Sequence, residues 1–380
     1  MDFRHIPTNF ILYITLYGGV TIASLIACLY ICLRKGNAFK PDVSPPLRLR
    51  RWISALFAML FFGHIWWLLC YIYSDSTSSV SFVLAAMFDF VALLTTIPGT
   101  LLAMLQDRKR PVWPILLATI PLVALGAIYI IHPNSRFISI AAAYFMLVYL
   151  LFTLYMVFAI RQYGRWLRDN YADLENKEVW LSHLLIIVVF LLIIFYRFVG
   201  DNITISFIVQ AVEIPFFGFL LWRIETLPQL ESATTEQPEQ LEQPEQLERP
   251  EQLEPETQQA HQTVDIPSNI EQLLEEHCVR TKLYLQHDLT LLRLAQAIGT
   301  NRFYLSQYFT QQGIHYNTYI NNLRIDHFVN LCREATAAGK PFTAQQLANE
   351  SGYRSYSTFS LAFKQRMGQT VTAWMHETAQ

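Results

Sequence analysis

Long runs of apolar residues fill the first 222 positions of the chain and are separated by short polar segments. Seven of them approach or exceed the roughly 18–20 apolar residues that a helix needs to cross about 30 Å of hydrocarbon. These runs cover residues 9–33, 53–73, 80–105, 114–131, 138–160, 180–199 and 203–222. The first is too long for a signal-peptide core and is not followed by a small-residue cleavage site, so we expect it to be retained. The pattern predicts a bundle of seven transmembrane helices over residues 1–224.

The pattern changes after the last apolar run. Residues 225–264 are almost entirely Glu, Gln, Pro and Leu, and from Glu236 a six-residue unit repeats as EQPEQL, EQPEQL and ERPEQL. Its regular prolines forbid a continuous helix and its glutamates repel one another. The segment is therefore predicted to be a disordered, extended linker that reaches at most about 120 Å at ~3.1 Å per residue.

Residues 265–380 return to the mixed composition of a globular domain, and two segments within them share one pattern. Each has a small alanine, a glycine, two apolar residues four positions apart and a closing glycine. These residues are Ala295, Gly299, Leu305, Phe309 and Gly313 in the first segment and Ala348, Gly352, Phe359, Phe363 and Gly368 in the second. The alanine allows two helices to cross closely, the glycines suit left-handed turns and caps, and the apolar pair forms a buried helix face. We predict two helix-turn-helix units, whose second helices are capped by Thr300 and Ser355.

Two further helices complete this domain. Residues 317–334 have an apolar stripe that includes Ile320, Leu323, Phe328 and Leu331, which predicts one long helix that spaces the two units. Residues 265–286 predict an amphipathic helix before the first unit. The fold class is therefore all-α: a seven-transmembrane-helix bundle, a disordered linker, and a C-terminal domain of two helix-turn-helix units joined by a long helix.

The residues of this domain resemble those of the AraC/XylS family of bacterial transcription regulators. The resemblance rests on YINNLRI from Tyr319 and on AxxxGYRSYSTFSLAFKxxxG from Ala348, and it covers about residues 289–374. The sequence departs from the family where Phe328 replaces a small alanine, Val371 a proline and Trp374 a common tyrosine. These departures affect packing and not the DNA-facing positions. The family's usual soluble ligand-binding domain is absent, so the resemblance implies nothing about a ligand.

The resemblance implies that the second helix of each unit enters a major groove, with the two grooves about one DNA turn, ~34 Å, apart. The residues expected to face base edges are Arg302, Phe303, Ser306 and Gln307 in the first unit and Tyr356, Ser357, Ser360 and Leu361 in the second. Gln307 suits adenine, Arg302 suits guanine or a phosphate, and Phe303 suits a thymine methyl group. The residues expected to contact phosphates are Arg354, Lys364 and Arg366. The alternative for each residue is a merely solvated helix face.

Basic residues alternate loop by loop between the apolar runs. Thirteen Lys and Arg lie in the first, third and fifth loops, whereas Arg4 and Arg136 are the only ones on the opposite side. The positive-inside rule therefore predicts an external N-terminus and a cytoplasmic C-terminus. A DNA-binding domain attached to a membrane requires that chromosome and membrane share a compartment, which predicts the cytoplasmic (inner) membrane of a bacterium.

Three ionisable residues lie deep within the predicted spans. His64, Asp89 and Glu213 each lie about 14–15 Å from the outer end of a span at 1.5 Å per residue, near the bilayer midplane. Such residues are costly in hydrocarbon and are candidates for function. Our hypothesis is a buried polar cluster that binds a ligand or a proton. The alternative, a hydrogen-bonded cluster that only holds the helices together, remains open.

Catalytic and metal-binding motifs are absent from the sequence. It contains no GxSxG, no HExxH and no CxxC, and Cys28, Cys32, Cys70, Cys278 and Cys332 are interpreted as buried thiols. We expect no enzyme activity, cofactor or metal.

The sequence thus predicts a membrane-embedded transcription regulator whose partners are double-stranded DNA and the lipid bilayer. Its seven-span half either senses a small-molecule or membrane-derived signal or only anchors the protein, and a homodimer is one form it can take. The alternative is a transporter or enzyme with a regulatory DNA-binding tail. Because a flexible linker cannot transmit a helix rotation, we expect a signal to act through oligomerisation or effective concentration. Proteolytic release at the linker is the rival route.

Overall fold

The computed structural model describes residues 8–34, 36–39, 45–73, 80–175, 177–199, 203–230 and 269–378. The chain divides into two compact units: Met1–Tyr163 with Asn176–Ala233, and Gly164–Glu175 with Thr234–Gln380. Most of the predicted linker lies outside the described residues. No β-strand occurs in the described ranges, and the single isolated bridge joins Tyr171 to Thr290. The all-α prediction is therefore confirmed.

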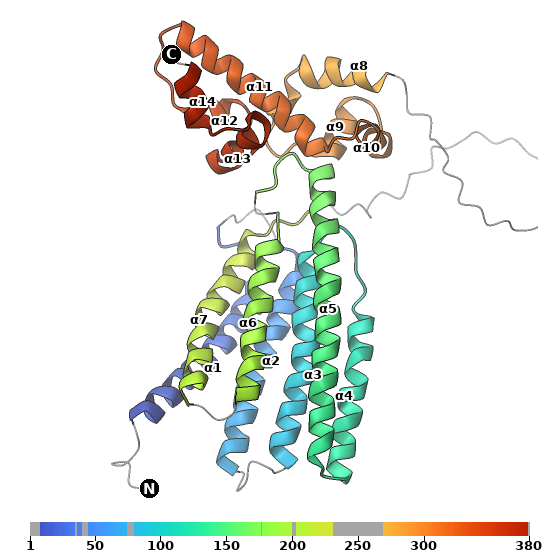
Figure 1. Cartoon of the computed structure of the whole chain (residues 1–380), viewed down its shortest axis with the longest axis vertical. Coiled ribbons are helices and arrows are strands. Elements are labelled where there is room, and N and C mark those ends of the chain that lie inside the picture. Colours follow the sequence, from blue (N-terminus) through green and yellow to red (C-terminus); the bar gives the residue numbers. More distant parts are fainter. Residues whose placement is uncertain are drawn as a thin grey trace, which may run out of the picture. The chain divides into compact units, whose positions relative to one another are not determined.

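In the first unit, the helices of the described residues run side by side as a bundle (Figure 1). They are α1 (Thr8–Leu33), α2 (Leu47–Tyr73), α3 (Val80–Met104), α4 (Trp113–Ile131), the larger part of α5 (Ser135–Asn170), α6 (Trp180–Val199) and α7 (Ile203–Thr226). Each covers one predicted apolar run to within one residue, and α2 and α5 extend well beyond theirs. Among the described residues, six are long and apolar enough to cross a membrane; in α6 the apolar stretch found is the shorter Trp180–Val189.

The bundle is closely packed inside and apolar outside. α2 packs against α1 and α3, and α7 packs against α1 and α6. At Gly99 of α3 an added Cβ would collide with the indole ring of Trp52, so this crossing requires glycine. Large aliphatic side chains such as Leu117 and Leu154 are more than half exposed on the outer faces of α4 and α5. In water they would form extended apolar patches, whereas in a bilayer they would face lipid.

The first half of the second unit surrounds one hydrophobic core. It contains α8 (Ile270–Leu274), the π-helical turn η2 (Glu275–Val279), the 3₁₀ turn η3 (Leu283–Leu285), α9 (Leu291–Ala297) and α10 (Arg302–Gln311). The predicted single helix over residues 265–286 is wrong at its C-terminal end. Lys282 has a φ of 57°, in the left-handed region, so the helical segment ends at Val279 and a separate 3₁₀ turn follows.

The second half contains α11 (Tyr316–Ala337), α12 (Ala344–Glu350), α13 (Tyr356–Met367) and α14 (Val371–Thr378). The long helix predicted over residues 317–334 is confirmed as α11, which crosses the unit in Figure 1. α11 contributes Tyr316 and Ile320 to the first core, and Ile325, Phe328 and Cys332 to a second core formed with α12, α13 and α14. Each helix-turn-helix unit therefore has its own core, and one helix joins the two.

The turns of both units follow the predicted glycine pattern with one correction. Gly299 has a φ of 72° and Gly352 one of 88°, and an added Cβ at Gly352 would lie 2.7 Å from the backbone oxygen of Leu285. Ser355 caps α13 as predicted, because its Oγ accepts a hydrogen bond from the backbone amide of Thr358. The predicted Thr300 cap is wrong, because α10 begins one residue later and Asn301 accepts from the backbone of Tyr304.

The five cysteines do not all have the predicted environment. Cys70, Cys278 and Cys332 are buried, but Cys28 is only partly buried and Cys32 is exposed near the end of α1. The Cys32 Sγ lies 2.9 Å from the Ser54 Oγ of α2. Across the described ranges, no group of three or more His, Cys, Asp or Glu side chains is placed to hold a metal ion.

Candidate nucleic-acid interface and intramembrane polar cluster

The second helix of the first helix-turn-helix unit, α10, has one buried face and one accessible face. Leu305 and Phe309 point into the first core and are 0% and 3% exposed. On the other face Phe303 is 54% exposed, and Ser306 and Gln307 are partly exposed. A phenyl ring kept in solvent beside polar groups that can read a base edge is the arrangement expected of a major-groove helix.

Arg302, the first residue of α10, is only partly exposed and is already hydrogen-bonded. Its Nε and Nη2 donate to the Oδ1 of Asn170 at 3.1 and 2.6 Å. Asn170 is the last residue of α5 and belongs to the same compact unit as α10. The guanidinium that the sequence assigned to DNA is therefore held by another segment of the chain in this structure.

The second helix of the second helix-turn-helix unit, α13, has the same division into a buried and an accessible face. Phe359 and Phe363 are fully buried, Ser357 and Leu361 are exposed, and Ser360 is partly exposed. The Leu361 side chain is 61% exposed, more than any other large apolar side chain described in the C-terminal residues.

Tyr356 serves the core of the second unit as well as its surface. Its ring packs on that of Phe359, with centroids 5.7 Å apart, and it is partly exposed.

The three expected phosphate contacts differ in their surroundings. Lys364 is exposed on α13. Arg354 forms an ion pair with Asp288, and Arg366 forms one with Asp326 at 2.6 Å and also donates to the backbone oxygen of Asn322. Arg366 thus braces α13 against α11. To reach a phosphate, either arginine would exchange a carboxylate partner for the phosphate, whereas Lys364 is ready for that contact.

Sequence reasoning missed a buried arginine between the two helix-turn-helix units. Arg324 of α11 is 1% exposed, donates to the backbone oxygens of Tyr284 and Gln286 at 2.7 and 2.8 Å, and lies over the Tyr353 ring. Burial lowers the pKa of Arg324, while the nearby Tyr353 hydroxyl acts in the opposite direction. The signal was present in the sequence, because Arg324 lies midway between Ile320 and Phe328 on the apolar stripe, where a charge requires buried partners.

The tandem architecture agrees with a comparison against known protein families. A family model described as a helix-turn-helix domain matches residues 294–377, from α9 through α14. Residues 294–377 are an AraC/XylS-type helix-turn-helix domain. The match contains both units, so α10 and α13 are the second helices of this AraC/XylS-type domain. No curated protein and no solved structure matches the chain.

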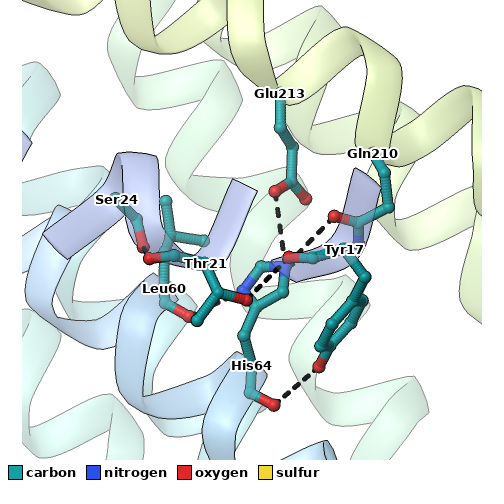
Figure 2. A network of polar contacts seen from close by, with 7 residues as sticks. All are labelled: Tyr17, Thr21, Ser24, Leu60, His64, Gln210 and Glu213. Carbon is teal, nitrogen blue, oxygen red and sulfur yellow. Dashed lines mark hydrogen bonds and ion pairs between the residues drawn. The ribbon is translucent and has the colours of Figure 1, made fainter. Parts of the chain in front are cut away.

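The first compact unit, which the AraC/XylS-type match does not cover, contains a buried network of polar side chains (Figure 2). His64 of α2 and Glu213 of α7 are 9% and 6% exposed, and the His64 Nε2 lies 3.6 Å from the Glu213 Oε2. Gln210, one turn before Glu213, places its amide 3.3 Å from the same ring nitrogen. The Tyr17 hydroxyl of α1 donates to the His64 backbone oxygen at 2.6 Å. Three helices therefore meet at one imidazole.

The predicted trio of intramembrane residues is only partly brought together. His64 and Glu213 are neighbours, but the Asp89 Oδ2 accepts a hydrogen bond from the Trp67 Nε1 at 2.7 Å. Asp89 nevertheless lies beside Gly63, the residue before His64, since an added Cβ at Gly63 would be 3.3 Å from its Oδ1. Depth along each span could be read from the sequence, but helix rotation could not.

The two ring nitrogens of His64 have different neighbours. Its Nδ1 lies 2.7 Å from the backbone oxygen of Leu60, which only accepts, so Nδ1 carries a hydrogen. Nε2 then accepts from the Gln210 amide nitrogen, and the Glu213 Oε2 lies 3.6 Å from the same ring nitrogen.

Proposed function

We propose that this protein is a membrane-embedded, sequence-specific DNA-binding transcription regulator. The observation that carries the proposal is the pair of second helices, α10 and α13, each with a buried apolar face and an accessible face of mixed polar and apolar residues. Phe303 and Leu361 provide apolar contacts for thymine methyl groups, and Gln307 provides the bidentate contact for adenine. Lys364 supplies a phosphate contact that positions the domain without reading sequence.

The proposal is tested with the purified full chain in lipid nanodiscs and a DNA duplex selected from a randomised pool. Gln307→Ala should relax the selected sequence at one half-site and cost about 1–3 kcal/mol of discrimination there. Lys364→Ala should weaken binding to all duplexes and reduce the salt dependence by about one counterion. Gln345→Ala, which alters an exposed glutamine of α12, is the matched control and should do neither. Uniform binding of unrelated duplexes by the unaltered chain would refute sequence-specific recognition.

For the membrane half we propose a sensor centred on His64, Glu213 and Gln210, with the N-terminus outside and the AraC/XylS-type domain in the bacterial cytoplasm. Support comes from the buried imidazole of α2, which lies beside a carboxylate and an amide of α7. Glu213→Gln keeps the shape of the side chain but replaces the carboxylate beside the imidazole by an amide. In a reporter strain it should abolish the response to the inducing condition while leaving the protein level unchanged. Asp89→Asn, which alters the neighbouring Trp67 contact, should have a smaller effect.

The competing role for the membrane half is that of an anchor. Replacing the seven helices by an unrelated membrane anchor separates the two roles. If the helices only anchor the protein, transcription stays regulated after the replacement, and if they sense the signal, the regulation is lost. An unchanged response in both Glu213→Gln and the anchor replacement would exclude sensing by this cluster.

A further inference from the structure

The end of α5 extends well past the predicted membrane span. α5 has 36 residues and is therefore about 54 Å long at 1.5 Å per residue, whereas hydrocarbon needs only ~20 residues. Its last seven residues and the loop after them, Gly164–Glu175, belong to the same compact unit as the AraC/XylS-type domain. The chain therefore enters this unit at two places, through α5 and through the linker.

The contacts of this segment converge on the N-terminal ends of α10 and α11. Asn170 accepts both hydrogen bonds from Arg302, the first residue of α10. The Asp169 Oδ1 lies 2.6 Å from the Nδ1 of His315, the N-cap residue of α11. The Asn317 side-chain amide donates to the backbone oxygens of residues 171 and 172 at 3.2 and 2.5 Å.

The segment also takes part in the first hydrophobic core. Ala172 is 1% exposed and packs in the cluster that contains Leu305 and Phe309 of α10. Its backbone amide donates to the Leu289 oxygen at 3.2 Å, beside the isolated bridge from Tyr171 to Thr290. A side-chain pair at the surface is weak by itself, but backbone pairing and a buried apolar residue make this a specific docking contact.

The docked segment and DNA require the same group. A major-groove helix uses its N-terminal residues to contact base edges, and Arg302 is the first residue of α10. Asn170 occupies the Nε–Nη2 edge of the Arg302 guanidinium, so that edge is not open to a guanine or a phosphate while the segment is docked. We propose that residues 169–172 are an autoinhibitory clamp, which holds the first helix-turn-helix unit away from DNA and is released when the protein is activated. This inference rests on the proposed function, because it assumes that α10 binds DNA.

The clamp gives the membrane half a route to the DNA-binding domain that avoids the linker. α5 is one continuous helix from Ser135 to Asn170, so a change at its membrane-embedded part can shift the equilibrium of its last turn. If about a tenth of the molecules are released at rest, the apparent dissociation constant for DNA is about tenfold above the intrinsic value.

The test uses the full chain in nanodiscs and the selected duplex described above. Removing both side-chain contacts with Asp169→Ala and Asn170→Ala should raise DNA affinity by up to about tenfold. Arg168→Gln alters the exposed neighbour on the same turn and should leave the affinity unchanged. An unchanged or lower affinity in the double variant would overturn the clamp, since the segment would then be neutral or would support the DNA-binding form.

Arg302→Ala separates failure of the clamp from failure of the proposed function. If both hold, Arg302→Ala lowers affinity in the Asp169→Ala and Asn170→Ala background. If only the clamp fails, it lowers affinity equally in the unaltered chain, and the double variant alone has no effect. If it changes affinity in neither background, α10 does not use Arg302 on DNA and the assumption behind the clamp is wrong.

Hydrogen exchange supplies a second readout that does not depend on affinity. The Ala172 amide is bonded to Leu289 and should exchange slowly in the free protein. Saturating duplex should accelerate this exchange, because DNA and the clamp exclude each other. Equal protection with and without DNA would show that both bind together and would overturn the proposal.

Discussion

Phe328 tests the view that each helix-turn-helix unit has a separate core. Its side chain is 0% exposed, and its ring centroid lies 4.5 Å from that of Phe359, 5.7 Å from Phe363 and 6.3 Å from Trp374. Truncating a buried phenylalanine to alanine costs about 3–5 kcal/mol through lost transfer energy and an unfilled cavity. Phe328→Ala should therefore increase opening of the second helix-turn-helix unit by roughly 140- to 3,700-fold, since each 1.4 kcal/mol is a factor of ten.

The assay is native-state hydrogen exchange of the full chain in nanodiscs, read separately in α9 with α10 and in α12 with α13. The large acceleration should be confined to α12 and α13, because Phe328 belongs to the second core only. Phe303→Ala makes the same chemical change at a side chain that is 54% exposed, and its effect on stability should stay within about 0.5 kcal/mol. Equal acceleration in both halves would refute the separation of the cores, and an effect below tenfold would refute the packing argument.

Three further predictions concern the same unit. In the same exchange assay, Gly352→Ala should destabilise the second helix-turn-helix unit by more than Gly368→Ala. Both glycines have a positive φ, which costs alanine about 1–2 kcal/mol, but only at Gly352 would the new methyl group meet the backbone, 2.7 Å from the Leu285 oxygen. Arg324→Met removes two buried hydrogen bonds and should lower the free energy of unfolding by about 1–3 kcal/mol, measured as increased proteolysis between the two helix-turn-helix units. Burial and the nearby Lys282 lower the pKa of His327, so the folded protein resists protonation of this ring. The contribution of His327 to stability is complete above about pH 6.5 and is lost as the pH falls toward the lowered pKa of the folded state. His327→Gln should abolish that part of the pH dependence of exchange in α11.

Local patterns were sufficient to predict most helices and both helix-turn-helix units. A glycine that needs a left-handed turn and an i, i+4 pair of buried apolar residues act within a few positions, so they can be read from the sequence alone. The break at Lys282 could not, because a single left-handed residue in a polar segment leaves no periodic signal. The cap of α10 was misplaced for a similar reason: Thr300 and Asn301 can both cap a helix, and the backbone chooses between them.

The functional contacts were harder to predict than the helices. Depth in the membrane identified His64 and Glu213, but rotation of the helices decides that Asp89 faces Trp67. The pairing of Asn170 with Arg302 joins residues 132 positions apart. Both are ordinary polar residues at helix ends, where either would be expected to contact water. Such a contact has no sequence signature in a single chain.

Because the chain passes into the second unit twice, its synthesis follows a fixed order. Asn170 leaves the ribosome 132 residues before Arg302, which corresponds to about 7–26 s at 5–20 residues per second. During that interval the last helices of the bundle and the linker are made, and the end of α5 waits without its partner. The first core can close only when α10 arrives, and Ala172 is one of the residues it closes around. If the proposed clamp holds, each new molecule completes the fold of its α9–α14 domain around residues 169–172, which are already made, and starts in the form that does not bind DNA.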